Sequence, residues 1–278
     1  MSITSWLKRH YAALGEAIAE VERESLAYRQ SRDPSRLMLH MIGVVIVASF
    51  ALSLQNEFGS SNSYGTLEWF IAPFSDSPKS VIQGIFRKGP YARLYRLLYW
   101  VGATSFCYFV LPALYIKLAM RERLRDFGFS IKGALKHSWI YVGLYLLVLP
   151  ALFVVGQTKS FQSTYPFYEH TSRSSIDFFG WESAYALQFL CLEFFFRGFL
   201  VHSMKKQFGV YCILIGIMPY CMIHFGKPLP ETLGAIFAGL ALGLLSLLTR
   251  SIWLGVAIHV SVAVSMDIIS LWLQGKLF

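Results

Sequence analysis

Three residues with side chains suited to hydrolysis lie inside or at the ends of long apolar stretches: Glu193, His224 and His259. A charged side chain inside a membrane costs at least about 2.5–3.5 kcal/mol on insertion scales, so such residues are functional candidates. A partly buried carboxylate can take a proton from water, and a neutral imidazole can donate a hydrogen bond to the oxyanion that forms on an attacked carbonyl. If the three groups converge, the sequence predicts a hydrolytic site.

The same three residues allow a second chemical interpretation, a metal site. One Glu and two His can hold a zinc ion that keeps an open coordination position. The HExxH spacing of zincins is absent from the sequence. The residues alone do not separate the two chemistries. We expect the site to work without a metal, zinc being the alternative, and we expect no other cofactor.

Further polar residues near these three are candidates for supporting roles. Arg197 follows Glu193 by four residues and shares its helical face, so it either orients Glu193 or forms a buried pair that only fixes helix register. Asp267 lies eight residues after His259 and either supports that residue, caps a helix or pairs with a basic group. Glu231 precedes the sixth apolar stretch, where an acid favours a helix N-terminus.

The composition shows what kind of protein must position these groups. Of 278 residues, 55% are hydrophobic and 15% charged, and the mean hydropathy is +0.49, whereas soluble domains have about 25% charged residues. A soluble fold and a disordered chain are excluded. The four cysteines all lie in apolar stretches, which excludes a disulfide scaffold. The net charge of +9 comes from Lys and Arg between the apolar stretches, which is typical of membrane loops rather than of nucleic-acid binding.

The apolar stretches are long enough to cross a membrane as helices. A hydrocarbon core of about 30 Å needs roughly 20 helical residues. Barrel strands are excluded because the runs are continuous rather than alternating. We therefore expect an all-α, polytopic transmembrane bundle of about seven spans, at residues 37–55, 97–116, 138–156, 181–204, 209–225, 232–249 and 252–274.

The basic residues predict an orientation. Residues 1–36 and the loop 117–137 each carry six Lys or Arg, so both are expected in the cytoplasm, with the C-terminus outside. The loop 56–96, which is also basic, opposes this orientation, and we expect an interfacial helix in it at 81–96. We expect an integral protein of a prokaryotic cytoplasmic membrane.

The chain is expected to divide into three parts. Apolar residues spaced as one helical face between positions 3 and 21 predict an amphipathic helix, either on the membrane surface or as a solvated arm. Together with the predicted orientation, this helix makes residues 1–36 the expected cytoplasmic N-terminal arm. Residues 37–175 would hold the N-terminal spans and loops, and residues 176–278 the catalytic-type core.

Three short motifs resemble those of the CAAX-prenyl-protease and bacteriocin-processing (CPBP) family of intramembrane proteases, also called the abortive-infection family. The family pattern EExxxR, followed by Gly and an aromatic residue, resembles LEFFFRGF, which contains Glu193 and Arg197. FxxxH resembles the segment from Tyr220 to His224, and HxxxN resembles the segment from His259 to Ala263. The order and spacing of the motifs fit over residues 180–275.

The resemblance implies a helical membrane protease in which a glutamate activates water and histidines assist, although older interpretations of the family propose a metal. At two positions this sequence differs from the family pattern in a residue that the mechanism would use. The first Glu of the EE pair is Leu192, so Glu193 would have to serve as the base. The third motif ends in Ala263, which removes an amide expected to help hold the oxyanion, and Glu231 or Asp267 is a candidate substitute.

These observations leave three hypotheses. The first is an intramembrane endopeptidase that cleaves a membrane-proximal or lipid-anchored protein, with Glu193, His224 and His259 as catalytic residues and Arg197, Tyr220, Glu231 and Asp267 in support. The second is a catalytically inactive scaffold or immunity-type factor that acts through a partner protein. The third is a small-solute transporter, for which no inverted halves are evident. The expected partners are the lipid bilayer and a membrane-associated substrate.

Overall fold

The computed structural model describes residues 3–131 and 137–277, and these residues are almost entirely helical. No strand is present among them, and the only β-type contact there is an isolated bridge between Phe129 and Ser251. The predicted all-α membrane bundle is confirmed. Lys132 and Lys136 of the predicted basic loop lie outside the described residues.

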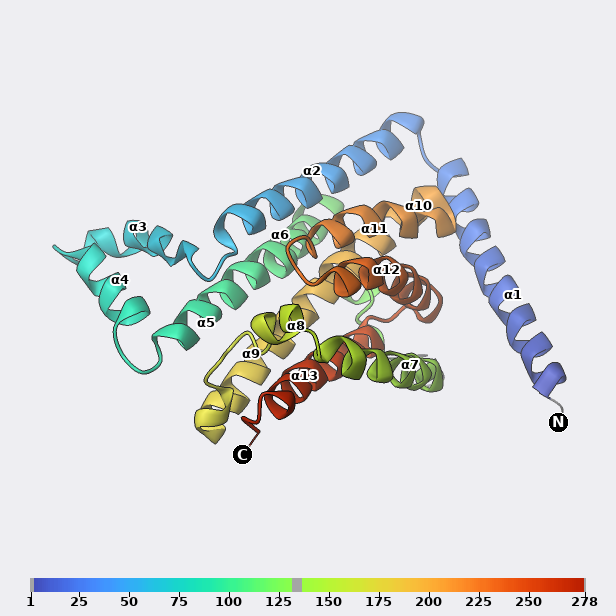
Figure 1. Cartoon of the computed structure of the whole chain (residues 1–278). Helices are drawn as coiled ribbons and strands as arrows, with labels where there is room; N and C mark the ends of the chain where they lie inside the picture. The colour runs from blue at the N-terminus through green and yellow to red at the C-terminus, as the bar shows by residue number, and fades with distance from the viewer. Residues whose placement is uncertain (1–2, 132–136, 278) are drawn as a thin grey trace. The chain divides into compact units, whose positions relative to one another are not determined.

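The α-helices, in chain order, are α1 (Ile3–Gln30), α2 (Pro34–Phe58), α3 (Leu67–Ile71), α4 (Pro78–Arg87), α5 (Ala92–Ser105), α6 (Leu111–Leu114), α7 (Ser138–Gly156), α8 (Lys159–Thr164), α9 (Ser175–Glu193), α10 (Val201–Phe208), α11 (Cys212–Met222), α12 (Leu229–Thr249) and α13 (Trp253–Leu273) (Figure 1). Short 3₁₀ turns occur at η1 (Ser63–Thr66), η2 (Ala72–Phe74), η5 (Leu124–Asp126), η7 (Thr171–Arg173) and η9 (Gly209–Tyr211). Three segments are π-helical: η3 (Phe106–Val110), η4 (Tyr115–Met120) and η8 (Phe194–Leu200).

Six helical segments among the described residues are long and apolar enough to cross a membrane: Pro34–Phe58, Ala92–Met120, Ser138–Gly156, Ser175–Met222, Leu229–Thr249 and Trp253–Leu273. The count differs from the expected seven because the predicted span 181–204 and most of the predicted span 209–225 belong to the single segment Ser175–Met222. Its 48 residues would be about 72 Å long as a straight helix, more than twice the hydrocarbon thickness. A glycine in the left-handed region, Gly209 with φ 53°, interrupts it between α10 and α11.

The chain forms two compact units, each made of several segments. Unit 1 contains Met1–Ile46, Ile116–His137 and Phe196–Trp253, and unit 2 contains Val47–Tyr115, Ser138–Phe195 and Leu254–Phe278. The predicted three-part division along the sequence stays a prediction, as does the cytoplasmic position of the N-terminus.

In unit 1, α11 packs along α12, and α1 packs against α10 and η9 (Figure 1). The contact of α1 is polar. The Glu22 carboxylate accepts a hydrogen bond from the Val210 amide at 2.7 Å, and Ser25 donates to the Lys206 carbonyl at 3.3 Å. Arg250, at the end of α12, pairs with Glu24 of α1 at 2.5 Å. The predicted N-terminal helix is therefore present, and charged contacts hold its second half to the protein.

In unit 2, α5 packs along α9 through aromatic residues. The rings of Trp181 and Tyr185 on α9 stack with centroids 4.9 Å apart, and Trp100 of α5 lies 6.3 Å from each of them. The α13 residue Ala263 is buried in the same cluster. Bulky rings on α5 and α9 therefore meet a small side chain on α13, which gives α9 fixed neighbours along its buried face.

A small helical hairpin of residues 59–91, called the α3–α4 hairpin below, connects α2 to α5. It has its own core, in which Tyr64 stacks on Phe86 at 4.8 Å beside the buried Ile82. The predicted helix 81–96 is wrong in its bounds. The chain breaks at Gly89, which has φ 106°, so α4 and α5 are separate helices.

Candidate active site

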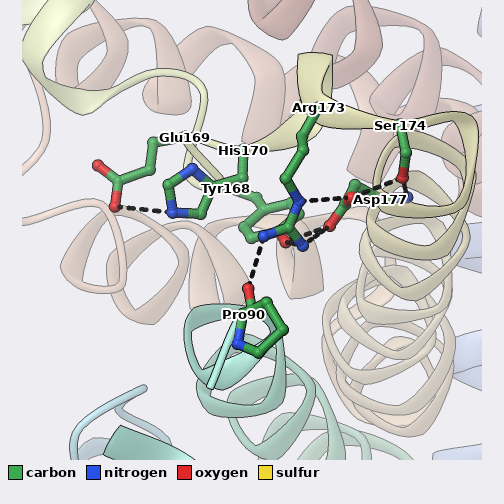
Figure 2. Close-up of polar contacts among 7 residues, drawn as sticks. All are labelled: Pro90, Tyr168, Glu169, His170, Arg173, Ser174 and Asp177. Atoms are coloured by element: carbon green, nitrogen blue, oxygen red, sulfur yellow. Dashed lines mark hydrogen bonds and ion pairs between the residues drawn. The ribbon is translucent and has the colours of Figure 1, made fainter. Parts of the chain in front are cut away.

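The start of α9 is fixed by a network of charged hydrogen bonds (Figure 2). Ser174 caps the helix: its hydroxyl oxygen accepts a hydrogen bond from the Asp177 amide at 3.1 Å and donates to the Asp177 carboxylate at 2.6 Å. Arg173 pairs with the same carboxylate at 2.6 Å and donates to the Pro90 carbonyl, also at 2.6 Å. The network thus ties the first turn of α9 to the residues before α5.

Tyr168 completes this network. Its hydroxyl donates to the Asp177 carboxylate, and the residue is fully buried. Burial, and then the hydrogen bond to Asp177, raises the pKa of Tyr168 well above its ordinary value. The hydroxyl therefore stays protonated and remains a donor to Asp177 at any physiological pH.

At the other end of α9, Glu193 meets His259 of α13. Glu193 is fully buried, and its Oε1 lies 2.8 Å from His259 Nδ1. The imidazole ring stacks on the ring of Phe189, with centroids 5.3 Å apart and planes inclined by 12°. Two groups suited to proton transfer are thus held in direct contact inside a membrane-spanning part of the protein.

A glycine leaves room for this carboxylate. Gly255 lies one helical turn before His259, and a Cβ atom added to it would be 2.5 Å from Glu193 Oε2 and 3.2 Å from Glu193 Cδ. Any side chain at position 255 would therefore displace Glu193. This role of Gly255 could not be predicted from the sequence, because glycine is common in membrane helices.

The backbone widens immediately after Glu193. Residues 194–200 form the π-helical segment η8, whereas the motif spacing assumed an α-helix between Glu193 and Arg197. Two ring pairs pack its start against the π-helical segment η3. Tyr108 stacks on Phe195 at 4.7 Å, and Phe109 contacts Phe194 at 4.8 Å. Local π-helical turns occur frequently at functional sites.

Unit 1 brings together the predicted residues Arg197, Tyr220 and His224. The Arg197 guanidinium lies 4.0 Å from the centroid of the Tyr220 ring, a cation–π distance. His224 Nδ1 lies 2.7 Å from the Tyr220 carbonyl oxygen, so this nitrogen is the donor, and the two rings are 4.8 Å apart. Arg197 and Tyr220 also line a pocket of about 10 Å³, enough for roughly one water.

The other two predicted supporting residues have different partners. Glu231, in the first turn of α12, pairs with Lys227 at 2.6 Å, which agrees with a role at the helix N-terminus. Asp267 is fully buried and accepts a hydrogen bond from Trp181 Nε1 at 3.1 Å. It also interacts electrostatically with Glu182 of α9. Asp267 lies eight residues beyond His259, about 12 Å along α13.

Glu182 is a buried polar residue that the sequence reasoning missed. It is 9% exposed and lies on α9, eleven residues before Glu193. Eleven residues are about three helical turns, so the two glutamates share one face of α9. That spacing was available in the sequence and is the signal that could have identified Glu182.

The described residues do not offer a metal site. No group of three or more His, Cys, Asp or Glu side chains among them is arranged to hold a metal ion. Glu193 and His259 supply two such groups, and zinc sites need at least three protein ligands.

Comparison with known proteins identifies one family. Residues 176–265 match a family described as type II CAAX prenyl endopeptidase Rce1-like. No curated protein and no solved structure is significantly similar to the chain. The matched segment contains Glu193, His224 and His259. It agrees with the resemblance drawn from the three motifs, and over residues 176–265 this integral membrane protein therefore carries an Rce1-like domain of the CPBP, or CAAX-protease, family.

Proposed function

We propose that the protein is an intramembrane endopeptidase in which Glu193 activates the attacking water and His259 assists. The observation that carries this proposal is the 2.8 Å contact between the Glu193 carboxylate and His259 Nδ1. It lies inside the segment that matches the Rce1-like family. A buried carboxylate beside an imidazole is a suitable arrangement for general acid–base catalysis.

The proposed reaction needs only water and a peptide bond. Glu193 takes a proton from water as the water oxygen forms a bond to the scissile carbonyl carbon. The proton then passes to the amide nitrogen as the carbon–nitrogen bond breaks, which leaves a carboxylic acid and an amine. His259 holds the Glu193 carboxylate in place and stabilises the charge that develops during the transfer.

The substrate class follows from the family and from the membrane location. A membrane protein of a protease family is expected to act on a membrane-associated protein. The family description names prenyl endopeptidases, so a lipid-anchored C-terminal segment is the first substrate to test. The roles predicted for Arg197, Tyr220 and His224 stay predictions, and each requires its own variant.

A second candidate, a catalytically inactive scaffold, is favoured by two buried positions. Leu192 stands where the family pattern has its first glutamate, and it is 5% exposed. Ala263 stands where a polar amide is expected, and it packs in the aromatic cluster of α9. Both positions thus hold buried apolar side chains. This is expected of a family member that kept the helical bundle and lost its hydrolytic activity.

One experiment separates the two candidates. The purified protein, Glu193→Gln and His259→Ala are incubated with a pool of lipid-anchored peptides that includes farnesylated C-terminal segments, with and without a chelator. The protease proposal predicts cleavage by the wild type and its loss in both variants, with no effect of the chelator. Glu169→Gln is the matched control, because Glu169 is an exposed carboxylate in the loop before α9.

The alternatives give different results. Cleavage by Glu193→Gln at the wild-type rate would refute the assigned base. Loss of cleavage with the chelator would indicate a metal. A wild type that cleaves nothing in the pool, while all variants keep the same partner in a pull-down, would favour the scaffold.

A further inference from the structure

We propose that the α3–α4 hairpin is an interfacial anchor that inserts aromatic side chains into the headgroup and upper acyl region of the lipid bilayer. This inference is independent of the proposed hydrolysis. It assigns a role to residues 59–91, which carry none of the motifs that resemble the family.

The hairpin presents large apolar side chains outward. Trp69, Phe70 and Phe74 are 84%, 74% and 87% exposed. They are not part of the hairpin's own core, which Tyr64, Ile82 and Phe86 form. Val81 and Ile85 of α4 are also exposed, at 40% and 42%. A hairpin that has a complete core and still exposes three large aromatic residues needs an apolar environment.

The membrane is the apolar environment to which the hairpin is attached at both ends. It follows α2, which ends at Phe58, and precedes α5, which begins at Ala92, and both helices belong to membrane-spanning segments. One crossing ends and the next begins at the hairpin, so it must lie at a membrane surface. Phe58 and Tyr95, which flank the hairpin along the chain, are also exposed. The ends of the two membrane-spanning segments thus expose aromatic side chains close in sequence to the hairpin.

The residue types also suit this position. Trp and other aromatic residues are enriched where lipid meets water. Three basic residues of the hairpin, Lys79, Arg87 and Lys88, are exposed and can contact phosphate groups. The acidic residues of the same segment are Glu68 and Asp76. We therefore expect the aromatic residues to provide most of the binding, with a smaller preference for anionic lipid.

The end of the hairpin is connected to the start of α9 through Arg173, within unit 2, and the Arg173 guanidinium also lies 4.6 Å from the centroid of the Tyr91 ring. Pro90, its penultimate residue, accepts a hydrogen bond from Arg173, which pairs with Asp177 at the start of α9. Helix α9 carries Glu193 at its other end. An anchored hairpin would therefore hold α9 at a fixed depth relative to the bilayer surface.

The test measures where Trp69 lies. The full-length protein and Trp69→Phe are reconstituted into vesicles of phosphatidylcholine and phosphatidylglycerol that carry bromine on the upper acyl chain. The difference between their emission spectra isolates Trp69. We expect a blue-shifted contribution that is mostly lost in brominated vesicles and is insensitive to iodide in the water. Trp69→Phe keeps an aromatic ring, and its thermal unfolding is compared with that of the wild type to verify folding.

Two results would overturn the proposal. Quenching of Trp69 by iodide but not by bromine would place the hairpin in water. Protection from both quenchers would show that protein, such as a second copy of this chain, covers it. A second variant, with Phe70→Ser and Phe74→Ser together, should shift the Trp69 emission to the red and restore quenching by iodide. Failure of that shift in a folded double variant would also refute the anchor.

Discussion

Replacing Gly255 with alanine tests the catalytic assignment without touching a catalytic group. The added Cβ would lie 2.5 Å from Glu193 Oε2, and an ordinary contact begins at 3.4 Å, so the carboxylate must move by about 0.9 Å. Both oxygens belong to one rigid group, so the 2.8 Å contact with His259 would be lost. A misplacement of about 1 Å can cost on the order of 100-fold in rate. We expect a loss of that size, with about 1–3 kcal/mol of destabilisation from the overpacking.

The assay compares cleavage of a lipid-anchored peptide by the wild type, Gly255→Ala and Gly180→Ala. Gly180 lies on α9, and a Cβ there would have nothing within 4 Å. Its replacement should leave the rate unchanged and stabilise the helix by roughly 0.5–1 kcal/mol. Thermal unfolding in detergent reports the stability of each variant.

Full activity of a folded Gly255→Ala protein would refute the reasoning. It would mean either that Glu193 need not be held within about 1 Å or that another group is the base. Equal loss of activity in both glycine variants would show instead that the effect does not depend on the position of Glu193.

Three further predictions concern other polar contacts within the two units. Arg173→Ala removes the ion pair of the buried Asp177 carboxylate and should lower the denaturation midpoint in detergent; an unchanged midpoint would contradict this. Glu22→Ala removes the acceptor of the Val210 amide and should increase hydrogen exchange along α1, whereas Glu16→Ala should not. Trp181→Phe removes the indole N–H that donates to the buried Asp267 carboxyl at 3.1 Å and should lower the unfolding free energy by about 1–3 kcal/mol; a variant that denatures at the wild-type midpoint would refute this.

Much of the fold could be predicted because membrane insertion imposes simple requirements. Long apolar runs must be helical to satisfy their backbone groups, which is why the bundle and the N-terminal helix were expected correctly. The number of crossings was harder to predict. The polar residues Lys205, Lys206 and Gln207 separate the two expected spans 181–204 and 209–225, but the helical segment Ser175–Met222 includes them, so six segments are observed rather than seven.

The site was predictable in part. The structure brings Glu193 and His259 into contact, although their catalytic roles stay predictions. The partners of Asp267 could not be derived, because which buried polar groups meet depends on how α9 and α13 are rotated about their axes. The pattern of apolar residues in a membrane helix says little about this rotation, because the residues that face lipid and those that face the protein core are both apolar.

The π-helical segment after Glu193 has a consequence for alignment and redesign. A π-turn holds more residues than an α-turn, so it is equivalent to an insertion in an α-helix. Removing one residue from Phe194–Leu200 would let the segment become α-helical and would leave the residues beyond it in register. Removing one residue from a regular part of the helix would instead rotate every later side chain by about 100°. The segment should therefore tolerate the loss of one residue better than α9 does. A related sequence that is one residue shorter here should be aligned with a gap inside Phe194–Leu200.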